Sequence, residues 1–428
     1  MKVSICRSEV NGEVFAPPSK SYTHRAITIG SLSKECVVER PLLSADTEAT
    51  IHACEMFGAK ITRQQDSLLI KGVNGMPKIP DNVIDVRNSG TTLRFMTAIS
   101  ALTDGVTILT GDNSLRTRPN GPLLDVLRDL SVDAYSTRNN GCAPLVVRGG
   151  MKGAIVKIDG SISSQFISAL LIACPLTTQS TTLSIKGELK SRPYVDMTLE
   201  VLEKAGAEIL EDDKYNVKFI IPAKQHYNLG TYLVPGDFSS ASYLLAAAAI
   251  MGSSVRVKNL FPSKQGDSRI IEILRDMGAR IDWDTESGIV SVRGGGELKG
   301  IHVDAAATPD LVPTIAVLAA AAKGETVIEN AEHVRFKETD RLHAMASELT
   351  KMGITVVEEH DKLIIKGGVL KGAEVHGWHD HRIVMALTVA GLVAGNTTID
   401  TAESIFISYP NFFDDMRSIG ANVMVSQE

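Results

Sequence analysis

Six copies of one unit make up the chain, and this repetition is the strongest constraint on its fold. A short polar head followed by an apolar helical segment begins at residues 21, 89, 163, 237, 308 and 380, so neighbouring copies start 68 to 74 residues apart. A second marker follows a second helix near residues 58, 131, 206, 278, 353 and 420; it is a glycine in five copies and a serine in the second. Because two independent markers share one period, we infer six structural repeats.

Each copy predicts the same order of elements. The polar head opens a helix, a short strand rich in Val, Ile and Thr follows, a second helix ends at the glycine, and two strands complete the unit. A period of about 70 residues is longer than that of the usual solenoid repeats, so six units predict two domains of three rather than a rod.

The domain boundary is expected in the segment GTYLVPGD, residues 230–237, where Gly and Pro precede the fourth copy. This boundary predicts an N-terminal domain of residues 18–234. The C-terminal domain would contain residues 1–17 together with 235–428, because the opening strand KVSICRS lies before the first copy and is expected to pair with the C-terminal half.

Composition limits the classes of function. The 44 Lys and Arg against 50 Asp and Glu give a net charge of −6, which offers no overall attraction to nucleic acid or to an anionic membrane. The five cysteines are scattered, without a C-x-x-C pair, which argues for a reducing cytosol and against a disulfide framework. No signal peptide is evident, and the longest apolar runs are too short to span a bilayer. We therefore expect a soluble, cytoplasmic protein with neither nucleic acid nor membrane as partner.

The heads of the six helices concentrate the candidate chemistry. Ser, Thr or Asp at a helix start is an ordinary cap when taken singly. Helix N-termini also carry unpaired N–H donors and a positive dipole end, which makes them suitable sites for anions. Basic residues gather at the same places, as Lys20, Arg25, Arg94 and Arg382 illustrate. A net-acidic chain with such local positive charge is expected to bind a small, multiply anionic substrate.

The second head is the clearest predicted anion cradle. There the strand NVIDV leads into RNSGTTLR, and Gly90 allows a ligand to approach the backbone closely. Neither a P-loop nor a G-x-G-x-x-G motif after a strand is present, so nucleotide binding by those routes is not expected. The sequence also lacks H-E-x-x-H and EF-hand patterns, and the close pair His379 and His381 would not share a helix face, so no metal site is expected.

The segment VRFKETDRLHAM, residues 334–345, is the most strongly charged stretch. If it is one helix, Lys337 and Arg341 lie at i,i+4 on one face, a like-charge pair that is unfavourable unless an anion lies between them. The alternative is a solvent-facing helix in which Glu338 pairs with Arg341 at i,i+3.

Carboxylates beside positive charge are the candidates for acid–base chemistry. Asp310 stands at the head of the fifth repeat, where the alternative is a simple N-cap. Glu338 lies within the charged segment, and Lys20 lies close to Arg25 at the first head, where it is a candidate for proton exchange.

Eight motifs resemble those of the 5-enolpyruvylshikimate-3-phosphate synthase family, in the family's order and over nearly the whole chain. They are PPSKSYTHRA, RNSGTTLRF, LRTRPNGPL, DGSISSQFISALL, KSRPYVDMTLE, PGDFSSASYLLAAA, RFKETDRLHAM and HDHRIVMAL. The resemblance implies the two-domain inside-out α/β barrel of the enolpyruvyl transferases, with six βαβαββ units, three per domain. It also implies transfer of the enolpyruvyl group of phosphoenolpyruvate to the 5-hydroxyl of shikimate 3-phosphate, with release of phosphate through a tetrahedral addition–elimination intermediate, on the route to chorismate and the aromatic amino acids.

The resemblance further implies the site residues. Asp310 is implied as the base that takes the hydroxyl proton, and Glu338, with Lys20 nearby, as the group that protonates the enolpyruvyl methylene. Tyr194 is expected near the shikimate ring. The implied ligands of shikimate 3-phosphate are Lys20, Ser21, Arg25, Ser163, Ser164, Gln165, Ser191, Asp310 and Lys337. The implied ligands of phosphoenolpyruvate are Lys20, Gly90, Arg118, Gln165, Arg341 and Arg382.

Two positions depart from the family pattern. Ile407 stands before the YPNFF segment where many relatives have a lysine, so one phosphoenolpyruvate contact is expected to be absent or supplied elsewhere. His333 stands where some members have asparagine. The resemblance implies that the two substrates are the only partners, with no metal and no cofactor, and we expect a monomer. It also implies sensitivity to glyphosate, because a side chain at position 90 would crowd this inhibitor.

The sequence opposes three alternative functions. The related transferase that acts on UDP-N-acetylglucosamine carries a cysteine in its reactive loop where this chain has Asn113, and the segments KETDRL and SSQF favour shikimate phosphate. A protein related to RNA 3′-phosphate cyclase shares similar repeats, but the net acidity and the lack of an aromatic stacking pattern oppose it. A non-catalytic repeat scaffold would not need so many charged residues at helix heads.

Overall fold

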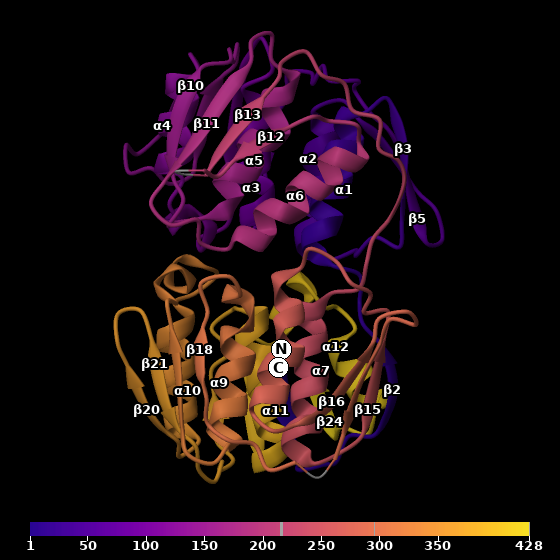
Figure 1. Ribbon diagram of the computed structural model, residues 1–428, viewed down its shortest axis with the longest axis vertical. Coiled ribbons are helices and arrows are strands. Elements are labelled where there is room, and N and C mark those ends of the chain that lie inside the picture. Colours follow the sequence, from indigo (N-terminus) through magenta and orange to yellow (C-terminus); the bar gives the residue numbers. More distant parts are fainter. Residues whose placement is uncertain (215–216, 295, 428) are drawn as a thin grey trace. The chain divides into compact units, whose positions relative to one another are not determined.

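The computed structural model describes residues 1–214, 217–294 and 296–427. Its internal contacts divide the chain into two compact units. Unit 1 consists of Met1–Pro17 and Pro235–Glu428, and unit 2 of Pro18–Val234. Within each unit the main helices lie inside and the sheets lie on the outside (Figure 1).

Unit 2 contains three repeats, and in each repeat the second helix is followed by two consecutive strands. In chain order they consist of α1 (Lys20–Leu32), β3 (Glu35–Glu39), α2 (Ala45–Met56), β4 (Lys60–Arg63) and β5 (Ser67–Lys71); β6 (Ile84–Asp85), α3 (Gly90–Ser100), β7 (Val106–Thr110), the 3₁₀ turn η1 (Leu115–Thr117), α4 (Gly121–Asp129), β8 (Asp133–Ser136) and β9 (Leu145–Arg148); and β10 (Ile155–Asp159), α5 (Ser164–Ala173), η2 (Cys174–Leu176), β11 (Thr181–Lys186), α6 (Arg192–Lys204), β12 (Leu210–Asp212) and β13 (Lys218–Ile221). The last strand, β14 (Gly230–Leu233), returns to the first repeat and pairs in parallel with β3.

Unit 1 contains the other three repeats. In order they consist of β2 (Gly12–Phe15), α7 (Phe238–Met251), β15 (Val255–Lys258), η3 (Gly266–Arg269), α8 (Ile270–Asp276), β16 (Arg280–Asp284) and β17 (Ile289–Arg293); β18 (His302–Asp304), η4 (Pro309–Leu311), α9 (Val312–Ala321), β19 (Glu325–Glu329), η5 (Glu332–Phe336), α10 (Arg341–Lys351), β20 (Thr355–Glu358) and β21 (Leu363–Lys366); and β22 (Glu374–Val375), α11 (His381–Ala394), β23 (Thr397–Ile399), η6 (Ala402–Ile407), α12 (Phe412–Ser418), β24 (Val423–Ser426) and β1 (Lys2–Ile5).

The described residues form six four-stranded sheets with one shared topology. Each sheet contains one parallel pair of strands. In four sheets a helical crossover joins the two strands of this pair, as it joins β6 to β7, whereas the pairs β14–β3 and β2–β15 are distant in the chain. The remaining strands add in antiparallel order, as β9 joins β7 and β8 joins β9. Repeating this order six times gives the βαβαββ units expected from the sequence. The expected two-domain fold with inner helices is therefore confirmed.

The opening strand pairs with the C-terminal half, as expected. Val3 in β1 lies opposite Ile399 of β23 and Val425 of β24, so β1 completes the sixth sheet. The next strand, β2, pairs in parallel with β15 and completes the fourth sheet. Residues from both ends of the chain thus share one apolar core in unit 1.

The innermost helices have apolar residues on every side, which explains why they are buried. In unit 1, α7, α9 and α11 contact one another, and nearly all their residues are buried. The second helix of each repeat instead shows one apolar face, as in α10, and covers the core from outside. The inner helices of unit 1 therefore have no exposed flank. No helix among the described residues is long and apolar enough to cross a membrane.

The second residue after each second helix has a left-handed backbone conformation in all six repeats. Its φ angles are 103° at Gly58, 69° at Ser131, 81° at Gly206, 97° at Gly278, 85° at Gly353 and 106° at Gly420. Glycine adopts this conformation without a steric penalty, whereas a residue with a Cβ does not. The second repeat therefore carries a local strain at Ser131 that the other five avoid.

We predict that Ser131→Gly stabilises unit 2 and that Gly206→Ala destabilises it. No atom lies within 4 Å of the position that a Cβ would occupy at Gly206, so only the backbone conformation opposes alanine there. We expect the free energy of unfolding to rise by about 0.5 kcal/mol for Ser131→Gly and to fall by about 1 kcal/mol for Gly206→Ala. Urea unfolding of both variants measures these changes. Shifts in the same direction would contradict the prediction.

Candidate active site

Arg341 lies at the centre of a charged cluster in unit 1. It is the first residue of α10, and its side chain is buried, with 1% exposed. The guanidinium Nε donates to Asp380 Oδ2 at 2.8 Å, Nη1 donates to Asp310 Oδ1 at 2.8 Å, and Nη2 donates to Glu338 Oε2 at 2.7 Å. One arginine therefore binds three carboxylates that come from three separate segments of the chain.

Asp310 connects this arginine to a second one. Arg382 Nη2 donates to Asp310 Oδ2 at 2.7 Å, so each oxygen of the carboxylate has its own guanidinium. Burial by itself raises the pKa of Asp310, but the charges of Arg382, Lys337 and Arg341 lower it by more and hold the pKa well below its ordinary value. The side chain caps no helix, since it lies in the η4 turn and binds guanidinium groups. The N-cap alternative for Asp310 is therefore wrong.

The charged segment 334–345 is not one helix. Its first residues form η5, and α10 begins at Arg341 because the Asp340 side chain accepts a hydrogen bond from His343 N as the N-cap. The prediction that Lys337 and Arg341 lie at i,i+4 on one helix face is therefore wrong. Both residues still approach Asp310, which contributes to the pKa shifts of both. Burial lowers the pKa of Lys337, while Asp310 acts in the opposite direction.

Two further buried carboxylates lie near this cluster and were not predicted as site residues. Asp237 is the N-cap of α7 and accepts from Ser240 N at 3.2 Å. Asp267, in η3, accepts a hydrogen bond from the Ser239 hydroxyl. Burial, followed by the negative charge of Asp310, raises the pKa of Asp267 to about 7. The motif PGDFSSAS indicated only a capped helix head, so it carried no signal for Asp267.

In unit 2, Lys20 begins α1 and forms an ion pair that the sequence did not indicate. Its Nζ lies 2.9 Å from Asp46 Oδ2, in the first turn of α2. The cap of α1 is Ser19, whose hydroxyl accepts from Tyr22 N. Lys20 and Asp46 are 26 residues apart, and only the folded repeat brings them together.

The head of α3 holds the predicted anion cradle. A Cβ at Gly90 would lie 2.2 Å from Arg94 Nη1 and 3.2 Å from Arg118 Nη1, so glycine leaves the space that these guanidinium groups occupy. Gln165, in the first turn of α5, donates to Thr91 Oγ1 at 3.0 Å and accepts from Arg94 Nη1 at 3.3 Å. The starts of α3 and α5 are therefore adjacent, with basic side chains around both.

Arg25 holds the first and third repeats together. The side chain is 2% exposed, and it donates to the Ser21 and Tyr194 carbonyl oxygens at 2.8 and 2.7 Å and to Thr198 Oγ1 at 2.8 Å. These contacts show a structural role in joining α1 to α6. Its implied role as a substrate ligand remains a prediction.

The remaining predicted residues also lie at helix starts. Ser163 is the N-cap of α5, Ser164 is its first residue, and Ser191 precedes α6 with a φ of 55°. Each unit thus collects its own share of the predicted site. Unit 2 holds Lys20, Ser21, Arg25, Gly90, Arg118, Ser163, Ser164, Gln165 and Ser191, and unit 1 holds Asp310, Lys337, Glu338, Arg341 and Arg382.

The two departures from the family pattern lie in 3₁₀ turns of unit 1. His333 is buried in η5, and Ile407 ends η6. In the part of the chain that the structure describes, no group of three or more His, Cys, Asp or Glu side chains is arranged to hold a metal ion.

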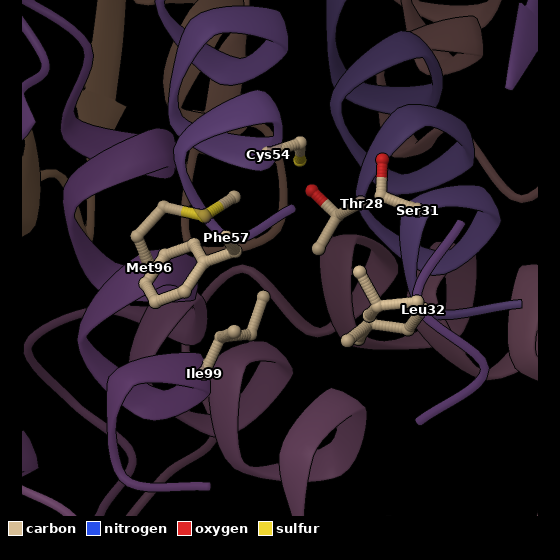
Figure 2. A pocket seen from close by; sticks show the side chains of 8 residues that line it. Thr28, Ser31, Leu32, Cys54, Phe57, Met96 and Ile99 are labelled. Carbon is tan, nitrogen blue, oxygen red and sulfur yellow. The ribbon is translucent and has the colours of Figure 1, made fainter. Parts of the chain in front are cut away.

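A small pocket in unit 2 does not coincide with these residues. It lies between α1, α2 and α3, next to Thr28, Cys54 and Met96, and apolar side chains form most of its wall (Figure 2). Its volume of about 10 Å³ is at the lower limit for one water molecule. The pocket is a packing gap in the core rather than a substrate site.

The chain is similar over its full length to proteins of one family. The sequence profile of EPSP synthase (3-phosphoshikimate 1-carboxyvinyltransferase) matches residues 6–416. The 3-phosphoshikimate 1-carboxyvinyltransferase of Methanococcoides burtonii is 71% identical, with 100% of both chains covered. That of Methanosarcina mazei is 68% identical over 99% of each chain. Among solved structures, an EPSP synthase from Acinetobacter baumannii has a TM-score of 0.84 at 28% identity, with 100% of both chains covered.

We predict that Asp267→Asn changes the pH dependence of stability. The folded-state pKa of about 7 exceeds the ordinary value of about 4 for an unfolded chain. Between these values the folded state binds more protons, so the free energy of unfolding falls as pH rises, by up to about 1.4 kcal/mol per pH unit. The loss is nearly complete about one pH unit above the folded pKa. Asparagine has no charge to bury and still accepts from Ser239. We therefore expect the variant to gain stability over the parent protein at pH 8 and not at pH 4.

Thermal unfolding at the two pH values measures this difference. The control is Asp276→Asn, which changes an exposed carboxylate at the end of α8 in the same unit. A stability difference for Asp267→Asn that is equal at pH 4 and pH 8 would show that Asp267 does not titrate in this range.

Proposed function

Since the chain belongs to the EPSP synthase (3-phosphoshikimate 1-carboxyvinyltransferase) family, we propose that its helix-head residues carry out the family's reaction. The chain is an enzyme of the shikimate pathway, which transfers the enolpyruvyl group of phosphoenolpyruvate to shikimate 3-phosphate and releases phosphate. Its substrates are these two small molecules. The family and the full-length relatives do not favour the UDP-N-acetylglucosamine or RNA 3′-phosphate cyclase alternatives.

Asp310 is the proposed base for the 5-hydroxyl of shikimate 3-phosphate. The observation that supports this role best is its contact with two arginines, Arg341 at 2.8 Å and Arg382 at 2.7 Å, which keep the carboxylate ionised. The same two arginines are the proposed ligands of phosphoenolpyruvate. When substrate anions compete for them, Asp310 loses part of its positive surroundings and its pKa rises, so it becomes a stronger base next to the bound substrate.

Glu338 is the proposed acid. While the hydroxyl oxygen adds to C2 of phosphoenolpyruvate and Asp310 takes its proton, Glu338 gives a proton to the C3 methylene, with Lys20 as a second proton-exchanging group. The tetrahedral adduct then releases phosphate, and a proton leaves C3 to restore the double bond. In support of this role, Glu338 Oε2 accepts from Arg341 Nη2 at 2.7 Å, and Arg341 Nη1 donates to Asp310, so both carboxylates share one guanidinium.

The anionic groups of the substrates are assigned to basic residues and helix starts. Arg118, Arg341 and Arg382 offer planar guanidinium forks that suit carboxylate and phosphate. In this proposal, the residues that bind shikimate 3-phosphate are Lys20, Ser21, Arg25, Ser163, Ser164, Gln165, Ser191, Asp310 and Lys337. The residues that bind phosphoenolpyruvate are Lys20, Gly90, Arg118, Gln165, Arg341 and Arg382.

The direct test of this function is release of phosphate from phosphoenolpyruvate in the presence of shikimate 3-phosphate. UDP-N-acetylglucosamine serves as the control acceptor. Phosphate release with UDP-N-acetylglucosamine but not with shikimate 3-phosphate would contradict the proposal. We also propose that the enzyme is a cytoplasmic monomer without metal or cofactor. Light scattering in a chelator, together with the same assay, tests the monomer and the metal independence.

We predict that Glu338→Gln slows the reaction without weakening substrate binding. The amide oxygen still accepts from Arg341, but the side chain no longer carries a transferable carboxyl proton. Loss of general acid catalysis should lower kcat by about 10²- to 10⁴-fold, with both KM values changed by less than about threefold. Steady-state phosphate release measures both quantities. The control Glu332→Gln changes an exposed carboxylate in the preceding turn and should have full activity.

We predict that Gly90→Ala weakens binding of phosphoenolpyruvate more than binding of shikimate 3-phosphate. The new methyl group would displace the Arg94 guanidinium and crowd that of Arg118. We expect KM for phosphoenolpyruvate to rise by about tenfold or more, because misplacing a binding group by about 1 Å can cost as much as about 10²-fold. Gly121→Ala is the matched control, since no atom lies within 4 Å of a Cβ there. An equal rise in both KM values would contradict the assignment of this head to phosphoenolpyruvate.

A further inference from the structure

Glu348 is a fully buried carboxylate outside the proposed catalytic cluster. It lies on α10, seven residues after Arg341, and 0% of its side chain is exposed. Its oxygens accept hydrogen bonds from Lys351 Nζ at 2.8 and 3.0 Å, from His376 N at 3.0 Å and from Trp378 Nε1 at 2.9 Å. Two of these three donors belong to the segment His376–His379, which we call the 376–379 loop.

The residues that follow β23 also contact the 376–379 loop. Asp400 Oδ1 accepts from Gly377 N at 2.9 Å, and its carboxylate lies 2.6 Å from His376 Nδ1. Thr401 Oγ1 accepts from His379 N at 3.2 Å. A Cβ at Gly377 would lie 2.5 Å from Thr401 Oγ1, so the loop is tightly enclosed there.

The loop has an unfavourable backbone conformation. Trp378 and His379 are successive residues with φ angles of 55° and 51°, a region that side chains with a Cβ rarely adopt. Such a conformation persists only where surrounding contacts impose it. In this loop, the hydrogen bonds to Glu348, Asp400 and Thr401 impose the conformation.

The 376–379 loop leads directly into the charged cluster. The next residue, Asp380, is the N-cap of α11, accepts from Arg382 N at 2.8 Å and binds Arg341. The path of the loop therefore sets where α11 begins and where Arg382 projects. Since residues seven apart lie on one face of a helix, α10 contacts this segment twice, through Arg341 to Asp380 and through Glu348 to the loop.

We propose that Glu348 is a positioning residue for Arg382 and acts through the 376–379 loop. The inference rests on the proposed function, in which Arg382 binds phosphoenolpyruvate. All partners of Glu348 are donors, so the site requires a group that only accepts. Glutamine has nearly the same shape, but its NH₂ group would face at least one of these donors and push it away. Glu348 thus keeps the strained loop in place, and the loop keeps Arg382 in position.

The test compares Glu348→Gln with a matched control. We expect Glu348→Gln to raise KM for phosphoenolpyruvate by about tenfold or more, with KM for shikimate 3-phosphate changed by less than about twofold. The control Lys351→Gln changes the half-exposed third partner, retains a donor to Glu348 and should leave both KM values unchanged. Trp378→Phe removes a single hydrogen bond, and we expect a smaller rise in the same KM. If Glu348→Gln does not fold, the effect of Trp378→Phe on KM for phosphoenolpyruvate tests the positioning role instead.

Arg382→Lys separates this inference from the proposed function. If both ideas are correct, Arg382→Lys raises KM for phosphoenolpyruvate, and adding Glu348→Gln to it has little further effect, because both changes act on one group. If Arg382→Lys raises this KM while Glu348→Gln and Trp378→Phe do not, the positioning role is wrong and the proposed function stands. If Arg382→Lys has no effect on this KM, the assignment of Arg382 fails, and the inference fails with it. Equal rises in both KM values for Glu348→Gln would indicate a general loss of packing and would overturn the inference.

Discussion

The charged cluster of unit 1 depends on the ion pairs of the buried Arg341 guanidinium. Asp310, Glu338 and Asp380 come from different segments, and all three bind this one guanidinium. Breaking a buried pair of this kind typically costs about 3–5 kcal/mol, because the remaining charge stays buried. Arg341 thus fixes the relative positions of the proposed base, the proposed acid and the start of α11. This one residue links stability to chemistry.

The fold explains why such a cluster forms at helix starts. The inner helices of unit 1 are buried along their length, so they expose no polar face. Their first turns hold the unpaired N–H groups and the positive ends of the helix dipoles. Each repeat brings one such turn to its neighbours, and three repeats gather three of them. An anion site therefore follows from packing apolar helices side by side.

Much of this arrangement was predictable from the sequence, because it depends on local patterns. The repeat period predicted the six units, and the glycine marker predicted the helix ends, even where Ser131 replaces glycine. The cluster partners were harder to predict. Lys20 meets Asp46 across 26 residues, and Arg341 meets Asp380 across 39, so only the tertiary fold brings them together. The helix expected over 334–345 was wrong in its first half, because the Asp340 cap starts α10 later than the charge spacing suggested.

The inner helices of the two units begin with different cap residues. In unit 2 the inner helices begin with serine caps, Ser19, Ser89 and Ser163, which are neutral and leave the dipole positive. In unit 1, α7 and α11 begin with the aspartates Asp237 and Asp380, which offset the dipole, and Asp380 also binds Arg341. Hydroxyl caps suit the binding of anionic groups, whereas carboxylates balanced by arginine suit proton transfer. The same repeated unit thus carries neutral hydroxyl caps in unit 2 and carboxylate caps at the starts of α7 and α11 in unit 1, so the cap residue sets the charge at each helix head.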